Sequence, residues 1–156
     1  MNQEKKSVLV VAAHPDDEVL GCGGTIANMA QEGARVTCLF LGKGKASRRH
    51  EGSGQMFEEQ AILQQEAEES ARILGISELL WENFPDQKYD SVPLLDIVQA
   101  IETVQKRVQP DTIFTHHPAD INLDHQIAFR AALTACRPTP GSGLRALYSF
   151  VIPAGA

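Results

Sequence analysis

The sequence of 156 residues has little of what marks several specialised classes of protein. It holds only three cysteines, far apart, which argues against a disulfide framework and for a reducing, cytoplasmic environment. No apolar run reaches the ~18 residues of a membrane helix, and no small-residue cleavage site follows the N-terminus. Basic residues (14) are outnumbered by acidic ones (20), giving a net charge of −6. We therefore expect no membrane span, no signal peptide and no nucleic-acid partner.

What is present is ordinary for a globular protein. Apolar residues make up 43% and charged residues 22% of the chain. The length fits one domain covering residues 1–156, with no internal repeat, low-complexity tract or interdomain linker. The composition thus does not indicate a function, which has to be inferred from the order of the residues.

Two hydrophobic patterns alternate along the chain. Short apolar runs predict strands at 7–13, 35–41, 78–84, 111–115 and 147–152, and helical periodicity predicts helices at 19–31, 58–74, 93–108 and 125–136. This alternation predicts an α/β fold with a mostly parallel sheet and helices on both faces. The polar segment 42–55 is predicted to be a long, functional loop. Ligands of such sheets bind beyond the carboxyl ends of the strands, near the topological switch point.

The first chemical motif, AAHPDDE, directly follows the first predicted strand. His14 and Asp17 lie three residues apart around a strand-to-helix turn, so both side chains can converge on one divalent metal ion. Pro15 stiffens the turn, and Asp16 would point differently from Asp17, which suits a general base. The alternative is a plain helix start, because proline and acidic residues are common there.

The second motif, THHPADINLDH, follows the fourth predicted strand. The two motifs together hold four of the five histidines of the chain, which favours a metal site over simple helix capping. A catalytic zinc site typically has three protein ligands and one open position. Beside His14 and Asp17, the third ligand is predicted to be His125, with His116 or His117 as rivals. Asp124 is predicted to be a neighbouring hydrogen-bond acceptor or a helix cap.

At these residues the sequence resembles a known family. The segments AHPDDEVLGCGGTIA and HPADINLDHQ resemble the zinc-dependent N-deacetylases related to the PIG-L and LmbE proteins. The resemblance implies a Rossmann-like three-layer fold and removal of an acetyl group from an N-acetylglucosamine unit of a glycoside, glycolipid or nucleotide sugar. It implies that His14, Asp17 and His125 bind Zn²⁺ and that Asp16 is the general base. Fe²⁺ or Co²⁺ would share these ligands.

The sequence departs from the family pattern at two places. Some relatives carry a histidine where this chain has Asn122, which can donate a hydrogen bond to an oxyanion but cannot supply a proton. Proton delivery would then fall to Asp16, His116 or His117. Some relatives also carry a substrate-binding arginine where this chain has Gln64 and Gln65. The basic segment 43–49 would replace it for an anionic substrate.

The resemblance also implies that the C-terminal part of this chain is short, because relatives continue past the fifth strand. It therefore predicts an open substrate cleft, which another subunit of a homo-oligomer would cover. A metal-binding family member without turnover and a zinc hydrolase acting on another amide are the alternatives. Dinucleotide binding is not supported, because Gly21, Gly23 and Gly24 do not have the required spacing and we expect them to allow close helix–sheet packing.

Overall fold

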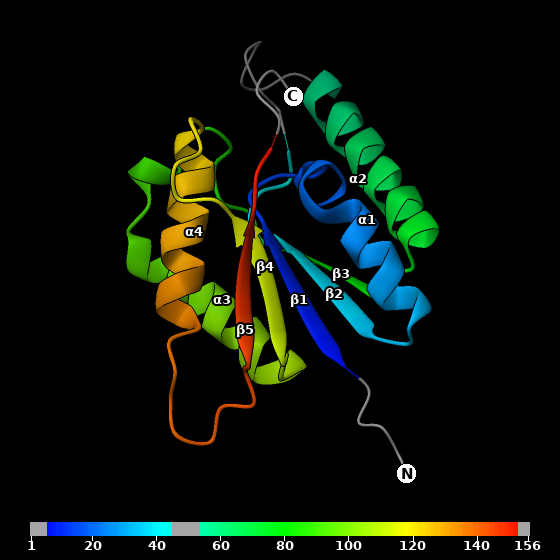
Figure 1. Ribbon diagram of the computed structural model, residues 1–156. Coiled ribbons are helices and arrows are strands. Elements are labelled where there is room, and N and C mark those ends of the chain that lie inside the picture. Colours follow the sequence, from blue (N-terminus) through cyan, green and yellow to red (C-terminus); the bar gives the residue numbers. More distant parts are fainter. Residues whose placement is uncertain (1–5, 45–53, 153–156) are drawn as a thin grey trace.

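The computed structural model describes residues 6–44 and 54–152, which form a parallel sheet flanked by helices (Figure 1). The strands are β1 (Ser7–Ala12), β2 (Arg35–Phe40), β3 (Glu78–Trp81), β4 (Thr112–His116) and β5 (Ala146–Phe150). The helices are α1 (Asp17–Gln31), α2 (Gly54–Leu74), α3 (Leu94–Val108) and α4 (Leu123–Ala135), with a short 3₁₀ helix η1 (Tyr89–Ser91). The predicted α/β alternation is confirmed.

The strands lie in the order β3-β2-β1-β4-β5, and every pairing is parallel. The strand order reverses between β1 and β4, which makes this the topological switch point. The loops after these two strands therefore emerge side by side at one edge of the sheet. They carry the two motifs that the sequence singled out.

Both faces of the sheet are covered, as predicted. α1 and α2 pack on one face, and α3 and α4 on the other (Figure 1). Alternate side chains of β1 enter opposite cores: Val8 and Val10 pack toward α1, and Leu9 and Val11 pack toward α3 and α4. This double burial explains why β1 is a continuous apolar run. All three cysteines are buried and free.

Several element boundaries differ from the prediction. β3 ends at Trp81 instead of residue 84, because its partner strand β2 ends at Phe40 and the ladder between them stops there. α2 begins at Gly54, so the predicted loop 42–55 is shorter, and its residues 45–53 lie outside the described part. The helix η1 was not predicted. No helix of the described part is long and apolar enough to cross a membrane.

One of the three clustered glycines allows the close packing that the sequence predicted. A Cβ atom at Gly21 would overlap the ring of Phe150, so β5 approaches α1 only because this residue has no side chain. A Cβ at Gly23 would make ordinary contacts, and one at Gly24 would meet nothing within 4 Å. The packing explanation is therefore confirmed for Gly21 and wrong for Gly24.

We expect Gly21→Ala to lower the free energy of unfolding by about 1–3 kcal/mol, because the new methyl group displaces Phe150. Gly24→Ala is the matched control, and it should be neutral or stabilise by up to about 1 kcal/mol through helix propensity. Urea unfolding of the two variants measures the difference. Equal stability of the two variants would show that the contact between Gly21 and Phe150 is unimportant.

Candidate metal centre

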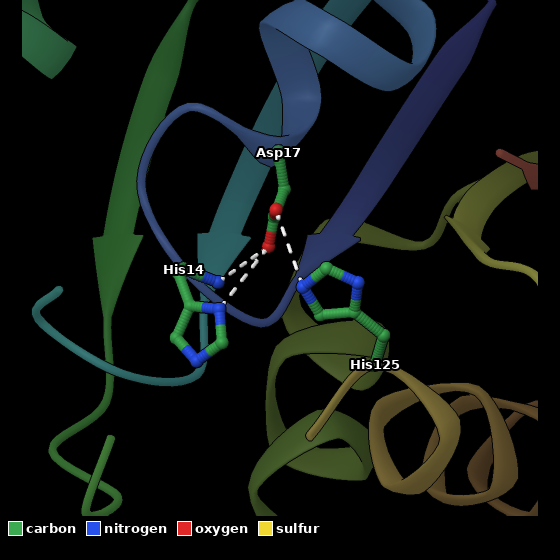
Figure 2. A group of neighbouring side chains, drawn as sticks. All are labelled: His14, Asp17 and His125. Atoms are coloured by element: carbon green, nitrogen blue, oxygen red, sulfur yellow. Dashed lines mark hydrogen bonds and ion pairs between the residues drawn. The ribbon is translucent and has the colours of Figure 1, made fainter. Parts of the chain in front are cut away.

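Three side chains from the two motifs converge at the switch point (Figure 2). His14 lies in the loop after β1, Asp17 is the first residue of α1, and His125 lies in the first turn of α4. His14 Nδ1 is 3.6 Å from Asp17 Oδ2, and His125 Nε2 is 3.4 Å from Asp17 Oδ1. Two imidazole nitrogens and one carboxylate therefore face a common point.

These separations fit a tetrahedral divalent cation. Zinc bonds to nitrogen and oxygen are about 2.0–2.1 Å long, and tetrahedral angles then place neighbouring ligand atoms about 3.3 Å apart. The separations of 3.6 and 3.4 Å are close to this value. Two imidazoles and a carboxylate are also ligands that zinc, iron and cobalt share. The residues present thus fit the metal that the family resemblance implies.

Carboxylates hold the outer nitrogens of both histidines. His14 Nε2 lies 2.9 Å from Asp124 Oδ2 and 2.7 Å from Asp86 Oδ1. His125 Nδ1 lies 3.0 Å from Asp120 Oδ2. A carboxylate can only accept a hydrogen bond, so each outer nitrogen carries a proton and each inner nitrogen can present its lone pair to a metal.

The same carboxylates set the protonation of the metal-free centre. Burial lowers the pKa of His14, but hydrogen bonds to Asp124, Asp17 and Asp86 outweigh burial and raise it to about 11. Burial raises the pKa of Asp17, yet its contacts with the imidazoles of His116, His125 and His14 bring it far below the ordinary value. His14 is therefore protonated next to a fully charged carboxylate.

The turn that carries Asp16 has an unusual backbone. Asp16 adopts the left-handed conformation, with φ of 89°, which is rare for a residue other than glycine. Its N–H donates to Glu18 Oε2 at 3.1 Å, and the His14 N–H donates to Asp17 Oδ2 at 2.8 Å. Pro15 has no N–H to satisfy. Glu18 is 1% exposed, so a buried carboxylate holds the conformation that separates Asp16 from Asp17.

The rivals for the third ligand are placed differently. His116 is fully buried, and its Nε2 accepts the Ala13 N–H at 2.9 Å, while its ring stacks on His125 with centroids 4.0 Å apart. His117 Nδ1 accepts the N–H of Ala119 in its own loop. The His116 nitrogen nearest Asp17 is Nε2, at 3.3 Å, and it already accepts the Ala13 N–H, whereas its Nδ1 is buried without a hydrogen-bond partner among the described residues. The contact of His116 with Ala13 and the loop contact of His117 support His125 as the third ligand.

Asn122 and Asp124 of the second motif make contacts that the sequence did not indicate. The N-cap of α4 is Asn122, whose Oδ1 accepts the N–H of Asp124, so the prediction of Asp124 as a cap is wrong. Asp124 also contacts His14 and not its chain neighbour His125. Consecutive helical residues point about 100° apart, so Asp124 and His125 face different partners.

Asp124 also fixes the loop that follows β3. Its two carboxylate oxygens accept the backbone N–H groups of Gln87, at 2.7 Å, and Tyr89, at 3.1 Å. The Tyr89 hydroxyl in turn donates to the carbonyl of Ala13 at 2.7 Å. A carboxylate that is 2% exposed thus connects the β3 loop, α4 and His14.

Sequence reasoning missed the roles of Asp86 and Asp120. The sequence indicates no partner for Asp86, and none for Asp120 although it lies within the second motif. The one available signal was that both are acidic residues in loops after strands, at the edge where the site was expected. Their pairing with particular histidine nitrogens depends on tertiary structure.

The centre opens into a cavity of about 320 Å³. It is lined by His14, Pro15, Asp16, Asp17, Leu20, Gly44, Leu63, Asp86, Gln87, Asn122, His125 and Ile152. Asp16 is exposed, whereas Asp17 is buried. The cavity therefore brings the proposed ligands, Asp16 and Asn122 to one wall that a small molecule can reach.

The fold and the site together define a parallel α/β protein with a histidine–aspartate centre at its switch point. A model of the family PIG-L, GlcNAc-PI de-N-acetylase, matches residues 9–136. This match includes both motifs and most of the chain. The chain belongs to the PIG-L family.

Individual relatives agree with this assignment. The chain is 29% identical to the uncharacterized deacetylase YaiS of Escherichia coli K12 over 147 residues, which are 88% of this chain and 71% of YaiS. It is similar to the structure of N,N'-diacetylchitobiose deacetylase from Pyrococcus horikoshii, with a TM-score of 0.74 and 29% identity over 85% of this chain and 49% of that one.

One similar structure has a different activity. GalB, the 4-carboxy-2-hydroxymuconate hydratase of Pseudomonas putida KT2440, has a TM-score of 0.71 and 30% identity over 83% of this chain and 55% of that one. The chain thus spans about half the length of both solved relatives. Fold and family alone do not select the reaction.

We expect His14→Ala, Asp17→Ala and His125→Ala each to raise the Kd for zinc by more than about 100-fold, because each removes one proposed ligand. His117→Ala is the control and should leave the Kd unchanged, since its ring bonds within its own loop. Competition with a fluorescent chelator measures the affinities. Unchanged zinc binding in the three ligand variants would make the assignment wrong.

Zinc affinity should rise with pH by up to about tenfold per unit between pH 6 and 8. The pKa of His14 in the metal-free protein is raised to about 11, so its inner nitrogen must lose a proton before it binds a cation. Calorimetry in buffers of different ionisation enthalpy counts the protons released on zinc binding. A pH-independent Kd with no proton release would contradict this account of the centre.

Proposed function

We propose that the protein is a metal-dependent hydrolase that removes the N-acetyl group from an N-acetylglucosamine-type sugar, releasing acetate and a free amine. The observation that carries the proposal is the placement of Asp16, exposed in the cavity beside His14, Asp17 and His125. Membership of the PIG-L family and the similarity to diacetylchitobiose deacetylase support the reaction and the sugar.

His14 Nδ1, Asp17 and His125 Nε2 would hold the metal, for which we propose Zn²⁺, with Fe²⁺ or Co²⁺ as alternatives. When bound, such an ion polarises a carbonyl and lowers the pKa of water. Asp124 and Asp120 keep the two imidazoles in the tautomers that this requires.

Asp16 is the proposed proton acceptor. As a water oxygen bonds to the acetamide carbon, a proton of that water passes to the Asp16 carboxylate. When the C–N bond of the resulting tetrahedral intermediate breaks, the same proton passes to the departing nitrogen. Asp16 makes no side-chain hydrogen bond to the start of α1, so the helix does not use this carboxylate as a cap.

Asn122 is proposed to bind the oxyanion. Its Oδ1 accepts the N–H of Asp124 at 2.9 Å, which fixes the side-chain amide and leaves Nδ2 as its donor. Asn122 lines the same cavity as Asp16. An amide cannot supply a proton, so in this proposal Asp16 serves both proton-transfer steps. Neither His116 nor His117 lines the cavity, which supports this assignment.

The predicted substrate class, cellular location and oligomeric state belong to the same proposal. We propose a small N-acetylated sugar as the partner and a cytoplasmic location, for which the three free cysteines offer support. A homo-oligomer remains the predicted assembly. The basic segment 43–49 lies largely outside the described residues, so its proposed contact with an anionic substrate stays a prediction.

A hydratase is the second candidate, since GalB is 30% identical. Both reactions need activated water, but a hydratase adds it to a carbon–carbon double bond and releases no acetate. Acetate release therefore discriminates between them. A family member that binds the metal without turnover, or a hydrolase of another amide, would release no acetate from these sugars either.

We expect Asp16→Asn to lower kcat for acetate release by about 10²–10⁴-fold, because an amide cannot accept the water proton. Asparagine tolerates the left-handed backbone of this position, and zinc content should be retained. Asp96→Asn, on the exposed face of α3, is the matched control and should keep full activity. Full activity of Asp16→Asn would refute its role, and absence of acetate release by the wild type from all N-acetylglucosaminides tested would refute the proposed reaction.

A further inference from the structure

A second cavity adjoins the metal centre beside α1 and α2. Figure 1 shows these two helices on the same face of the sheet. It has a volume of about 380 Å³ and is lined by Pro15, Asp16, Glu18, Val19, Leu20, Leu63, Glu66, Ala67 and Ser70. Pro15, Asp16, Leu20 and Leu63 also line the metal cavity. The two spaces therefore meet beside Asp16, and we call the second one the α1–α2 groove.

The walls of the α1–α2 groove are mostly apolar. Val19 is 38% exposed and Leu20 is 44% exposed, directly after the turn that carries Asp16. Leu63 and Ala67, four residues apart, supply an apolar strip on one face of α2. Apolar side chains that stay exposed next to a reactive centre typically mark a ligand surface.

The polar residues restrict the charge of a ligand. The far wall carries Glu66 and Ser70, and the metal cavity contributes Asp16 and Asp86. Among the described residues that line either space there is no lysine or arginine. An anionic group in the groove would meet carboxylates, and none of these described lining residues is a cation that would compensate them, so this part of the site suits a neutral apolar group.

We propose that the α1–α2 groove binds a neutral alkyl or aryl aglycone of the sugar whose acetamide lies at the metal centre. This proposal rests on the proposed function, because it places the acetamide beside Asp16. The groove then determines which glycosides are good substrates, with Val19 and Ala67 as specificity residues that the metal cavity does not share.

The test compares methyl, butyl and hexyl N-acetylglucosaminides, in both anomers. Each methylene that enters an apolar site contributes about fourfold in affinity, so kcat/KM should rise at least about tenfold from methyl to hexyl. Val19→Asn should reduce the ratio of kcat/KM for the hexyl over the methyl glycoside to within about threefold of unity. Because the ratio is taken within each variant, a general loss of activity cancels.

Leu95→Asn is the matched control, since Leu95 is 61% exposed on α3, on the opposite face of the sheet. Its ratio should equal that of the wild type. A wild-type hexyl-to-methyl ratio of kcat/KM near unity, or an unchanged ratio in Val19→Asn, would overturn the groove proposal. Deacetylation of the methyl glycoside in the same assay would leave the proposed function intact.

A binding measurement separates the two proposals if no glycoside is turned over. Hexyl and methyl glucosides, which lack the acetamide, are titrated into the full chain while the methyl resonances of Val19, Leu63 and Ala67 are followed. Saturable shifts with hexyl glucoside, at least about tenfold tighter than with methyl glucoside, would support the groove without the reaction. Unmoved resonances would overturn the groove by themselves.

Discussion

The rest of the site depends on the hydrogen bonds that the outer nitrogens of His14 and His125 donate to carboxylates. Asp124 and Asp120 accept these bonds, and they thereby direct the inner nitrogens toward Asp17. The arrangement concentrates acidic groups in a buried place. The positive charge on His14, whose pKa is raised, offsets part of their negative charge. Cation binding relieves the same imbalance.

The fold supplies the positions that this constraint requires. The loops after β1 and β4 meet only because the strand order reverses between those strands. Asp124 also joins the loop after β3 to the site, because its carboxylate accepts hydrogen bonds from the backbone N–H groups of Gln87 and Tyr89. The hydrogen bond from the Asp16 N–H to the buried Glu18 side chain holds Asp16 in the left-handed conformation. Backbone strain is thus placed at the residue proposed to move a proton.

The fold and the positions of the proposed ligands could be predicted from the sequence, because local patterns of residues determine them. The alternation of apolar runs and helical periodicity gave the α/β fold, and the positions of His14, Asp17 and His125 after two strands indicated their convergence. The partner of Asp124 could not be predicted, since it is His14, 110 residues away, and the helical rotation turns Asp124 from its neighbour. Asp86 and Asp120 likewise acquire their partners only in three dimensions.

The central claim is that one divalent ion is bound by His14 Nδ1, Asp17 and His125 Nε2. Anomalous diffraction at the zinc edge, from crystals of the zinc-loaded protein, tests it most directly. We predict a single strong peak within about 2.2 Å of these three side chains. A peak on the other side of His14, between Asp86 and Asp124, or no ordered zinc at the switch point, would contradict the account.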